Sequence, residues 1–297
     1  MLTIDQILAV ADPSPPSHGA LDQALVLGHR CDATVHVLAA FDGAPTEDAS
    51  ALRHRLSTLV AHRTRHLGAQ PSVSIPSPSG TGCGGEPASL LAYAQRHDIG
   101  LIVADTPSDR GPIPALASSA VRTLAEKADV PLFVVRDHSD TNTFQRILVP
   151  TDFSDPAASA FEHANELAAL YDASLDVLHV MERPRYVALN PTDLLAMSNA
   201  TLPERNAQRR LDDLIETAGG PDVPIRTHLR HGDATDQICH FVDEEPVDLV
   251  VLSTHEATGR RSHPLGNVAD KVLRRVTAPI FLTRAFGRSL VSPSAFL

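Results

Sequence analysis

The chain has 297 residues, 43% of them hydrophobic, and a formal net charge of -11 at pH 7, which suits two globular domains rather than one. The acidic balance argues against nucleic acid or an anionic membrane as a partner, and no apolar run is long enough to span a bilayer. Residues 1–17 lack the basic segment of a signal peptide, and the three cysteines fit neither a disulfide framework nor a zinc site, so we expect a cytoplasmic location.

The first half of the chain alternates apolar runs with stretches of helical periodicity. Short apolar runs predict strands at residues 7–10, 34–39, 101–104 and 132–135. Helical spacing of apolar residues predicts helices at residues 18–29 and 48–67. The glycine-rich segment 80–85 lacks the lysine and hydroxyl residue of a phosphate-binding P-loop, and we interpret it as a flexible turn.

The second half follows the same order. Strands are predicted at residues 147–152, 175–180, 226–230, 249–252 and 279–283. One helix is predicted to start with Asp155 as N-cap and Pro156 as first residue, and others cover residues 204–218 and 268–276. Three segments are predicted to lie outside these elements: a linker at 137–143, a loop or partly helical flap at 183–203 and a loosely attached tail at 287–297.

The two halves repeat one pattern. Residues 7–12 match 147–152 and residues 33–38 match 173–178, in both cases 140 positions later. Residues 101–104 match 249–252 and residues 130–134 match 278–282, now 148 positions later. Four matches in the same order indicate an internal duplication, and the second copy has gained about eight residues in its middle. We therefore divide the chain into domains at 1–138 and 144–286, followed by the tail.

Strands that alternate with helices predict an α/β fold with a parallel sheet in each copy. In such sheets ligands bind at the carboxyl ends of the strands, where the strand order reverses. That rule selects two places in each copy. One is the aspartate that ends the first strand, and the other is the loop after the fourth strand together with the helix start that follows it.

At these places the sequence resembles the universal stress protein (UspA) family. The segments that carry the resemblance are 146–154, 178–180, 248–255 and 265–272, and matching positions run through both halves. The resemblance implies two tandem five-stranded parallel α/β sandwich domains, like those of the adenine nucleotide alpha hydrolases. It also implies that the domains pair through their last strands, 132–135 and 280–283, into a pseudo-dimer within one chain.

The resemblance further implies a test for nucleotide binding, because family members that bind ATP carry Gly-x2-Gly-x9-Gly-Ser/Thr after the fourth strand. Glycines there allow the backbone to approach the phosphates, and the helix N-terminus favours an anion. The second copy reads Ser253-x2-Glu256-x9-Gly266-Asn267, so one glycine is kept. Asn267 is expected to cap the helix. A Glu256 carboxylate about 4 Å from a phosphate would cost roughly 4 kcal/mol at an effective dielectric near 20, unless Arg260 or Arg261 neutralises it.

The first copy reads Asp105-x2-Ser108-x9-Ser118-Ser119, with no glycine and an acid at the first position. We expect this copy to be structural and the second to hold any ATP or other adenine nucleotide. Pro150, Thr151 and Asp152 would hold base and ribose, and Val180 would line the adenine pocket. The residues expected around the phosphates are Ser253, Thr254, His255, Gly266, Asn267, Val268 and Ala269.

Other functions have weaker support. Ser253 lacks the Gly-x-Ser-x-Gly elbow of a serine hydrolase, and no general base is identifiable, so we expect a protein that is not an enzyme. His228, His231 and Cys239 lack the spacing of a metal site, and His179 is interpreted as a hydrogen-bonded core residue. The arginines at 209, 210, 226 and 230 are interpreted as a solvated face. The alternative to a nucleotide-binding stress-response protein is a nucleotide-independent interaction scaffold. The protein partner and any further homodimer stay open.

Overall fold

The computed structural model describes residues 2–11, 19–39, 49–66, 72–75, 87–106, 118–136, 143–182, 201–254, 265–284 and 289–291. Its first half contains the strands β1 (Gln6–Ala11), β2 (Thr34–Ala39), β3 (Val73–Ser74), β4 (Leu101–Thr106) and β5 (Leu132–Arg136). The helices of this half are α1 (Gly19–Cys31), α2 (Ala49–Arg63), α3 (Pro87–Arg96) and α4 (Ser118–Lys127), with a short 3-10 turn at Thr64–His66.

The second half repeats the order. Its strands are β6 (Arg146–Thr151), β7 (Ser174–Met181), β8 (Ile225–His231), β9 (Leu249–Ser253) and β10 (Ile280–Thr283). Its helices are α5 (Asp155–Tyr171), α7 (Thr201–Ala218), α8 (Ala234–Glu244) and α9 (Asn267–Arg275). None of the helices in the described part of the chain is long and apolar enough to cross a membrane.

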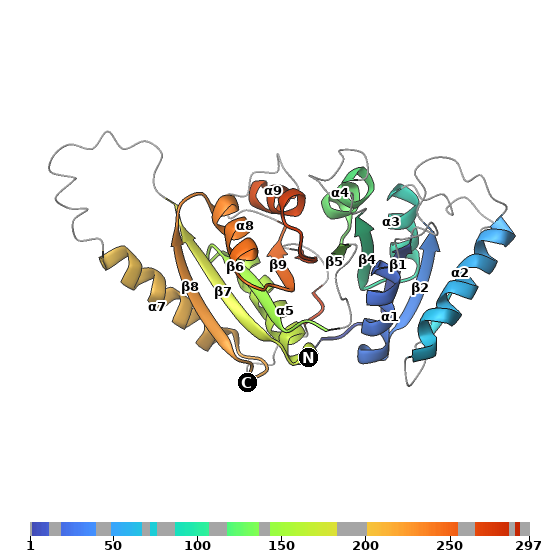
Figure 1. Ribbon diagram of the computed structural model, residues 1–297, viewed down its shortest axis with the longest axis horizontal. Helices are drawn as coiled ribbons and strands as arrows, with labels where there is room; N and C mark the ends of the chain where they lie inside the picture. The colour runs from blue at the N-terminus through green and yellow to red at the C-terminus, as the bar shows by residue number, and fades with distance from the viewer. Residues whose placement is uncertain are drawn as a thin grey trace.

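The ten strands in the described part of the chain form one sheet, in the order β3-β2-β1-β4-β5-β10-β9-β6-β7-β8. Within each half the strands are parallel, as predicted, and the two halves meet at an antiparallel pair of last strands, β5 and β10. In that pair Phe281 lies opposite Phe133, with Ile280 opposite Val134 and Leu282 opposite Leu132. The tandem domains therefore pair through their last strands within one chain, as the resemblance implied (Figure 1).

Helices cover both faces of the sheet (Figure 1). One face packs against α1, α2, α5 and α7, and the other against α3, α4, α8 and α9. Side chains of each central strand alternate between the two cores, so Ile147 and Val149 of β6 face one core while Leu148 faces the other. Burial on both faces explains why the strands read as continuous apolar runs.

The sequence-based elements agree with the structure in their centres and differ at some ends. The N-cap of α5 is Ser154, not Asp155, because the Ser154 hydroxyl accepts the Ala157 N–H at 3.3 Å. His231, expected beyond a strand, is the last residue of β8. The sequence did not lead us to predict α3 or α8. For α8 a helix was indicated, because Asp233 is suited to the N-cap and apolar residues follow at helical spacing.

The predicted segments outside the elements fall mostly on residues outside the described ranges, including 80–85, 137–142 and 183–200. Residues 201–203 of the expected flap form the first turn of α7. Leu290, in the expected loose tail, is only 1% exposed. Its carbonyl accepts the Thr3 N–H at 2.7 Å and its N–H donates to His163 Nε2 at 3.1 Å, so residues 289–291 are packed onto both domains.

Two buried arginines cross the domain junction at equivalent positions, 148 residues apart. Arg284 follows β10 and donates to Leu124 O at 2.8 Å, to Val130 O at 3.0 Å and to Ala125 O, all in or after α4 of the first domain. Arg136 ends β5 and donates to Leu273 O of α9 in the second domain. Each is 8% exposed, and burial lowers the pKa of each to about 10. Each domain thus places a cation on the carbonyl end of the other domain's last helix, where the helix dipole favours it.

Replacement of Arg284 by Met should lower the free energy of unfolding by about 2–4 kcal/mol, because three buried carbonyls lose a charged donor. Urea denaturation followed by circular dichroism measures the change. Arg96→Met, an exposed arginine at the end of α3, is the matched control and should change the free energy by less than about 0.5 kcal/mol. Equal effects of the two substitutions would contradict the junction role of Arg284.

Candidate functional site

The strand order reverses beside β6 in the second domain. β6 pairs with β7 on one side and with β9 on the other, so the residues that follow β6 and β9 lie at the same edge of the sheet. This is the position where open α/β sheets bind ligands. The residues predicted for the site follow these two strands and the neighbouring β7.

Pro150 and Thr151 end β6 at this edge, and Asp152 follows them. Pro150 is half-buried, Thr151 is buried and Asp152 is exposed. One carboxylate oxygen of Asp152 accepts the Ser154 N–H at 2.9 Å and the Ser154 hydroxyl at 2.5 Å. The hydroxyl oxygen of Thr151 accepts the Phe153 N–H at 3.0 Å. These bonds hold a tight turn between β6 and α5, and they leave the outer face of the Asp152 carboxylate toward solvent.

Phe153 occupies the centre of that turn with a φ of 63°, a left-handed conformation that bulky residues rarely adopt. Its ring lies 4.3 Å from the His179 ring, and the Arg210 guanidinium stands 4.2 Å above it. Neither Phe153 nor Arg210 was predicted as a site residue. The position of Phe153 between two polar turn residues was the one feature of the sequence that could have indicated its role. No sequence pattern linked Arg210 of α7 to this edge. Arg210 is exposed, as predicted for a solvated face, and its guanidinium also contacts the site edge.

His179 in β7 joins this edge to β6. Its Nδ1 lies 2.8 Å from the carbonyl oxygen of Thr151, so the prediction of a hydrogen-bonded residue is confirmed, and the side chain is half-buried. Burial lowers the pKa of His179; the Thr151 carbonyl opposes that shift and the nearby Arg210 charge adds to it. The neutral ring with a proton on Nδ1 is the form that fits this geometry.

The phosphate side of the predicted site is the end of β9 and the start of α9. Ser253 is the last residue of β9, and Thr254 is fully buried with its N–H donating to Thr283 O at 3.2 Å. The N-cap of α9 is Gly266, with φ 77° and ψ 145°, and this residue makes no side-chain capping hydrogen bond. Asn267 is the first helical residue, so its predicted N-cap role is wrong: the chain enters the helix through a conformation that glycine adopts without strain.

The remaining predicted residues differ in exposure. Asn267 is exposed, Ala269 is buried, and the half-buried Val268 and Val180 pack against the core that α8 and α9 cover. Val180 thus lies on the same face of the sheet as α9. His255 and Glu256 lie outside the described residues, as do Arg260 and Arg261.

The matching edge of the first domain has a different chemistry. Asp105, the counterpart of Ser253, accepts the Ala20 N–H at the start of α1. A Cβ placed on the neighbouring Gly19 would lie 3.2 Å from the Asp105 carboxylate and 2.9 Å from Val135, so the packing here is tight. A carboxylate of the chain itself therefore occupies the electropositive start of α1. Asp12 lies outside the described residues.

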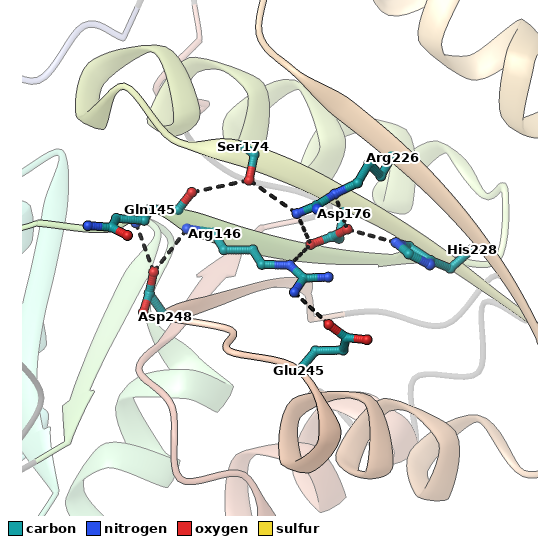
Figure 2. Close-up of polar contacts among 8 residues, drawn as sticks. All are labelled: Gln145, Arg146, Ser174, Asp176, Arg226, His228, Glu245 and Asp248. Carbon is teal, nitrogen blue, oxygen red and sulfur yellow. Dashed lines mark hydrogen bonds and ion pairs between the residues drawn. The ribbon is translucent and has the colours of Figure 1, made fainter.

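A second polar cluster lies at the opposite, amino-terminal end of β6 and β7 (Figure 2). Asp176 is fully buried and accepts bonds from Arg146 Nε, His228 Nε2 at 2.7 Å and Arg226 Nε at 3.2 Å. Burial alone would raise the pKa of Asp176, but the hydrogen bonds from Arg146 and His228 and the arginine charges hold it below its ordinary value. Arg146 also pairs with Glu245 at 2.6 Å.

This cluster accounts for residues whose roles the sequence did not show. Arg226 is exposed, as predicted, but it also pairs with the buried carboxylate of Asp176, and His228 contacts the same carboxylate. The cluster has a counterpart in the first domain, where Gln6, His36 and Tyr93 form an uncharged chain of bonds of 2.7 Å each. Among the residues that the structure describes, no three His, Cys, Asp or Glu side chains gather closely enough to hold a metal ion.

Comparison with known proteins identifies the family to which the chain belongs. Residues 3–136 and 143–284 each match the sequence model of the Universal stress protein family. Because the two matches cover most of the chain, the protein belongs to the universal stress protein family, as a tandem of two such domains.

Two curated relatives each match about half of the chain. Universal stress protein MJ0531 of Methanocaldococcus jannaschii is 27% identical over 145 residues, 48% of this chain and 84% of that protein. Universal stress protein YxiE of Bacillus subtilis is 27% identical over 147 residues, 48% of this chain and 99% of that protein.

Solved structures match the tandem as a whole. A putative universal stress protein from Pseudomonas aeruginosa superposes with a TM-score of 0.70 at 20% identity, over 95% of this chain and 93% of that one. A universal stress protein from Archaeoglobus fulgidus gives a TM-score of 0.62 at 17% identity, over 95% of this chain and 97% of that one. At these identities the likeness establishes the fold.

The lowered pKa of His179 predicts a pH-dependent part of the stability. Because the folded state holds this proton less tightly than the unfolded chain, the contribution is complete above about pH 6.5 and is lost as the pH falls below that value. His179→Asn keeps a donor near the position of Nδ1 and removes the titration. Urea denaturation at pH 7.5 and pH 5.5 should therefore show a smaller loss of stability for the variant.

His36 and His163, whose pKa values burial also lowers, remain in both proteins, so the difference between variant and parent isolates His179. An identical loss of stability on acidification would show that this residue does not contribute.

Proposed function

We propose that this universal stress protein has a non-enzymatic stress-response or regulatory role and binds ATP or another adenine nucleotide at the carboxyl edge of its second domain. The observation that carries the proposal is the start of α9. Gly266 is the N-cap residue of that helix, the first described helix after the switch-point strand β9, and it has no side chain with which to cap the helix amides. A helix start of this kind presents backbone amides and a positive dipole end to an anion.

The proposed pocket runs from β6 to α9 across the strand ends. The exposed carboxylate of Asp152 is suited to accept hydrogen bonds from ribose hydroxyls. Pro150 and Val180 offer half-buried apolar surface for the base on the face that α9 covers. The phosphates would be bound by Ser253, Thr254 and the amides of residues 267–269. His255 is included in this proposed set because of its position in the sequence.

The first domain is proposed to have a structural role. At its corresponding edge, the Asp105 carboxylate already accepts the Ala20 amide in the first turn of α1 and adds a negative charge where a phosphate would have to approach. Its α4 begins at Ser118, the position that corresponds to Gly266, so no glycine opens that helix. Both features oppose a phosphate in the first domain.

A nucleotide-independent interaction scaffold is the second candidate. Asp152 favours it, because the carboxylate already accepts two bonds from Ser154 and so has a complete role as a turn residue. The acid at Glu256 favours it as well. The two candidates differ in one measurable property, which is the affinity for nucleotide.

Millimolar ATP should raise the unfolding temperature of the full chain. With a dissociation constant of about 0.1 mM, about 5 mM ATP stabilises the folded state by about 2.3 kcal/mol. Differential scanning fluorimetry measures the shift, and calorimetric titration should give one site per chain. No shift and no heat at millimolar ATP would reject the nucleotide proposal in favour of the scaffold.

Glu256→Gly should tighten ATP binding, because it removes a carboxylate that would otherwise stand near the phosphates. The gain should reach at most about a thousandfold, the value of roughly 4 kcal/mol at 4 Å and an effective dielectric near 20. Ser108→Gly, at the corresponding position of the first domain, is the matched control and should leave the affinity unchanged. An unchanged affinity for Glu256→Gly would refute the charge argument, whereas tighter binding for Ser108→Gly would assign a site to the first domain.

A further inference from the structure

The junction of the two domains has a pseudo-twofold axis that passes between β5 and β10. Phe133 and Phe281 occupy equivalent positions, 148 residues apart, and lie opposite one another with ring centroids 5.6 Å apart. In a two-fold interface, residues near the axis meet their own equivalents. The chemistry of the residues near this axis therefore shows whether the surface suits a copy of itself or a different partner.

On one face of the sheet, α4 and α9 lie side by side above the junction (Figure 1). Arg122 of α4 and Asp270 of α9 are equivalent positions with opposite charges, and their side chains approach to 3.9 Å. One turn further on, the equivalent pair is Glu126 and Arg274, again with opposite charges. Every charge at these positions is reversed between the two domains.

On the other face, α1 and α5 show the same asymmetry. Arg30 of α1 donates to the carbonyl of Leu170, its own equivalent in α5, at 2.7 Å. The Arg30 guanidinium also lies 4.7 Å from the centre of the Tyr171 ring. The buried Gln23 donates to the Tyr171 hydroxyl at 2.6 Å, and the residue equivalent to Tyr171 in the first domain is Cys31.

A like-with-like pairing would lose the approach of Arg122 to Asp270 on one face and the contacts of Arg30 and Gln23 with Tyr171 on the other. Two first domains would set Arg122 against Arg122 and Arg30 against Arg30, and Gln23 would face the thiol of Cys31 in place of a phenol. Two second domains would set Asp270 against Asp270. Repulsion between these like charges weakens the pairing of two identical domains relative to the pairing of the two different domains. Such repulsion against an alternative partner is one source of specificity at interfaces.

We propose that the surface around β5 and β10 is an unlike-domain interface, which accepts the sister domain and rejects a copy of itself. Two chains then do not associate by pairing two first domains or two second domains through their last strands. The buried arginines Arg136 and Arg284 strengthen the junction but serve either pairing, whereas the charges near the axis select the partner. The inference holds whether or not the second domain binds nucleotide.

The expected selectivity follows from the number of reversed contacts. A like-charge contact at about 4 Å costs about 1 kcal/mol in bulk water, which is roughly a fivefold bias against that pairing. Two such contacts in a pair of first domains give roughly a 25-fold preference for the sister domain.

The test uses the whole chain with a protease site inserted between residues 137 and 142. One preparation carries an affinity tag at its N-terminus, and a second is untagged. Both are cleaved while folded, mixed, unfolded in urea, refolded together and captured by the tag, and the captured halves are quantified by mass spectrometry. We expect the tagged first domain to retain second domains, with untagged first domains below about one in 25. Capture of untagged first domains in amounts comparable to second domains would overturn the proposal.

A matched pair of variants shows whether charge is the cause. Arg30→Gln combined with Arg122→Gln should raise the captured first domains severalfold. Asp236→Asn combined with Arg275→Gln removes an ion pair of 2.6 Å between α8 and α9, within the second domain, and should leave the ratio unchanged. Equal ratios in all three proteins would contradict the charge mechanism.

If the cleaved halves do not refold, the uncut chain provides the second test. Arg122→Asp and Asp270→Arg should each lower the urea midpoint, because each also breaks an ion pair within its own helix, with Glu126 or Arg274. The double variant should lose less than the sum of the two single losses, because the opposite charges meet again across the axis with their places exchanged. A double variant whose loss equals the sum of the single losses would refute a direct contact across the axis.

Discussion

The antiparallel pairing of β5 with β10 is the contact on which the rest of the structure depends. It turns two five-stranded sheets into one sheet of ten strands and removes an open edge from each domain. Arg136 and Arg284 reinforce it from within, since each buried guanidinium binds carbonyls of the opposite domain's last helix. Because that helix in the second domain is α9, the junction also sets where the proposed phosphate site stands.

Duplication has given the protein two copies of one fold with different chemistry at equivalent places. At the switch-point edge, the first domain has Asp105, which accepts an amide at the start of α1, where the second domain has Ser253. The first domain also has Ser118 where the second has Gly266, the N-cap of α9. At the amino-terminal edge, an uncharged Gln6–His36 pair corresponds to the charged Arg146–Asp176 pair. The strands stay alike because both cores need the same buried faces, while positions outside the cores have diverged.

The sequence predicted the duplication, the parallel sheets and the pairing of last strands, because buried strands leave continuous apolar runs that repeat in order. It missed α3 and α8, whose short amphipathic patterns lie in the stretch where the two copies differ most. It also misplaced the helix cap at Asn267, because a capping side chain is visible in a sequence and the φ of Gly266 is not. The contacts of Arg210 with Phe153, and of Arg226 with Asp176, join segments whose separation in the sequence gives no signal.

The chemistry of the two edges places the proposed nucleotide site in the second half only. Crystals grown with millimolar ATP would show both edges in one experiment. We expect electron density for one nucleotide between Asp152 and the start of α9, and none beside Asp105. Density at the edge of the first domain, or at both edges equally, would contradict it.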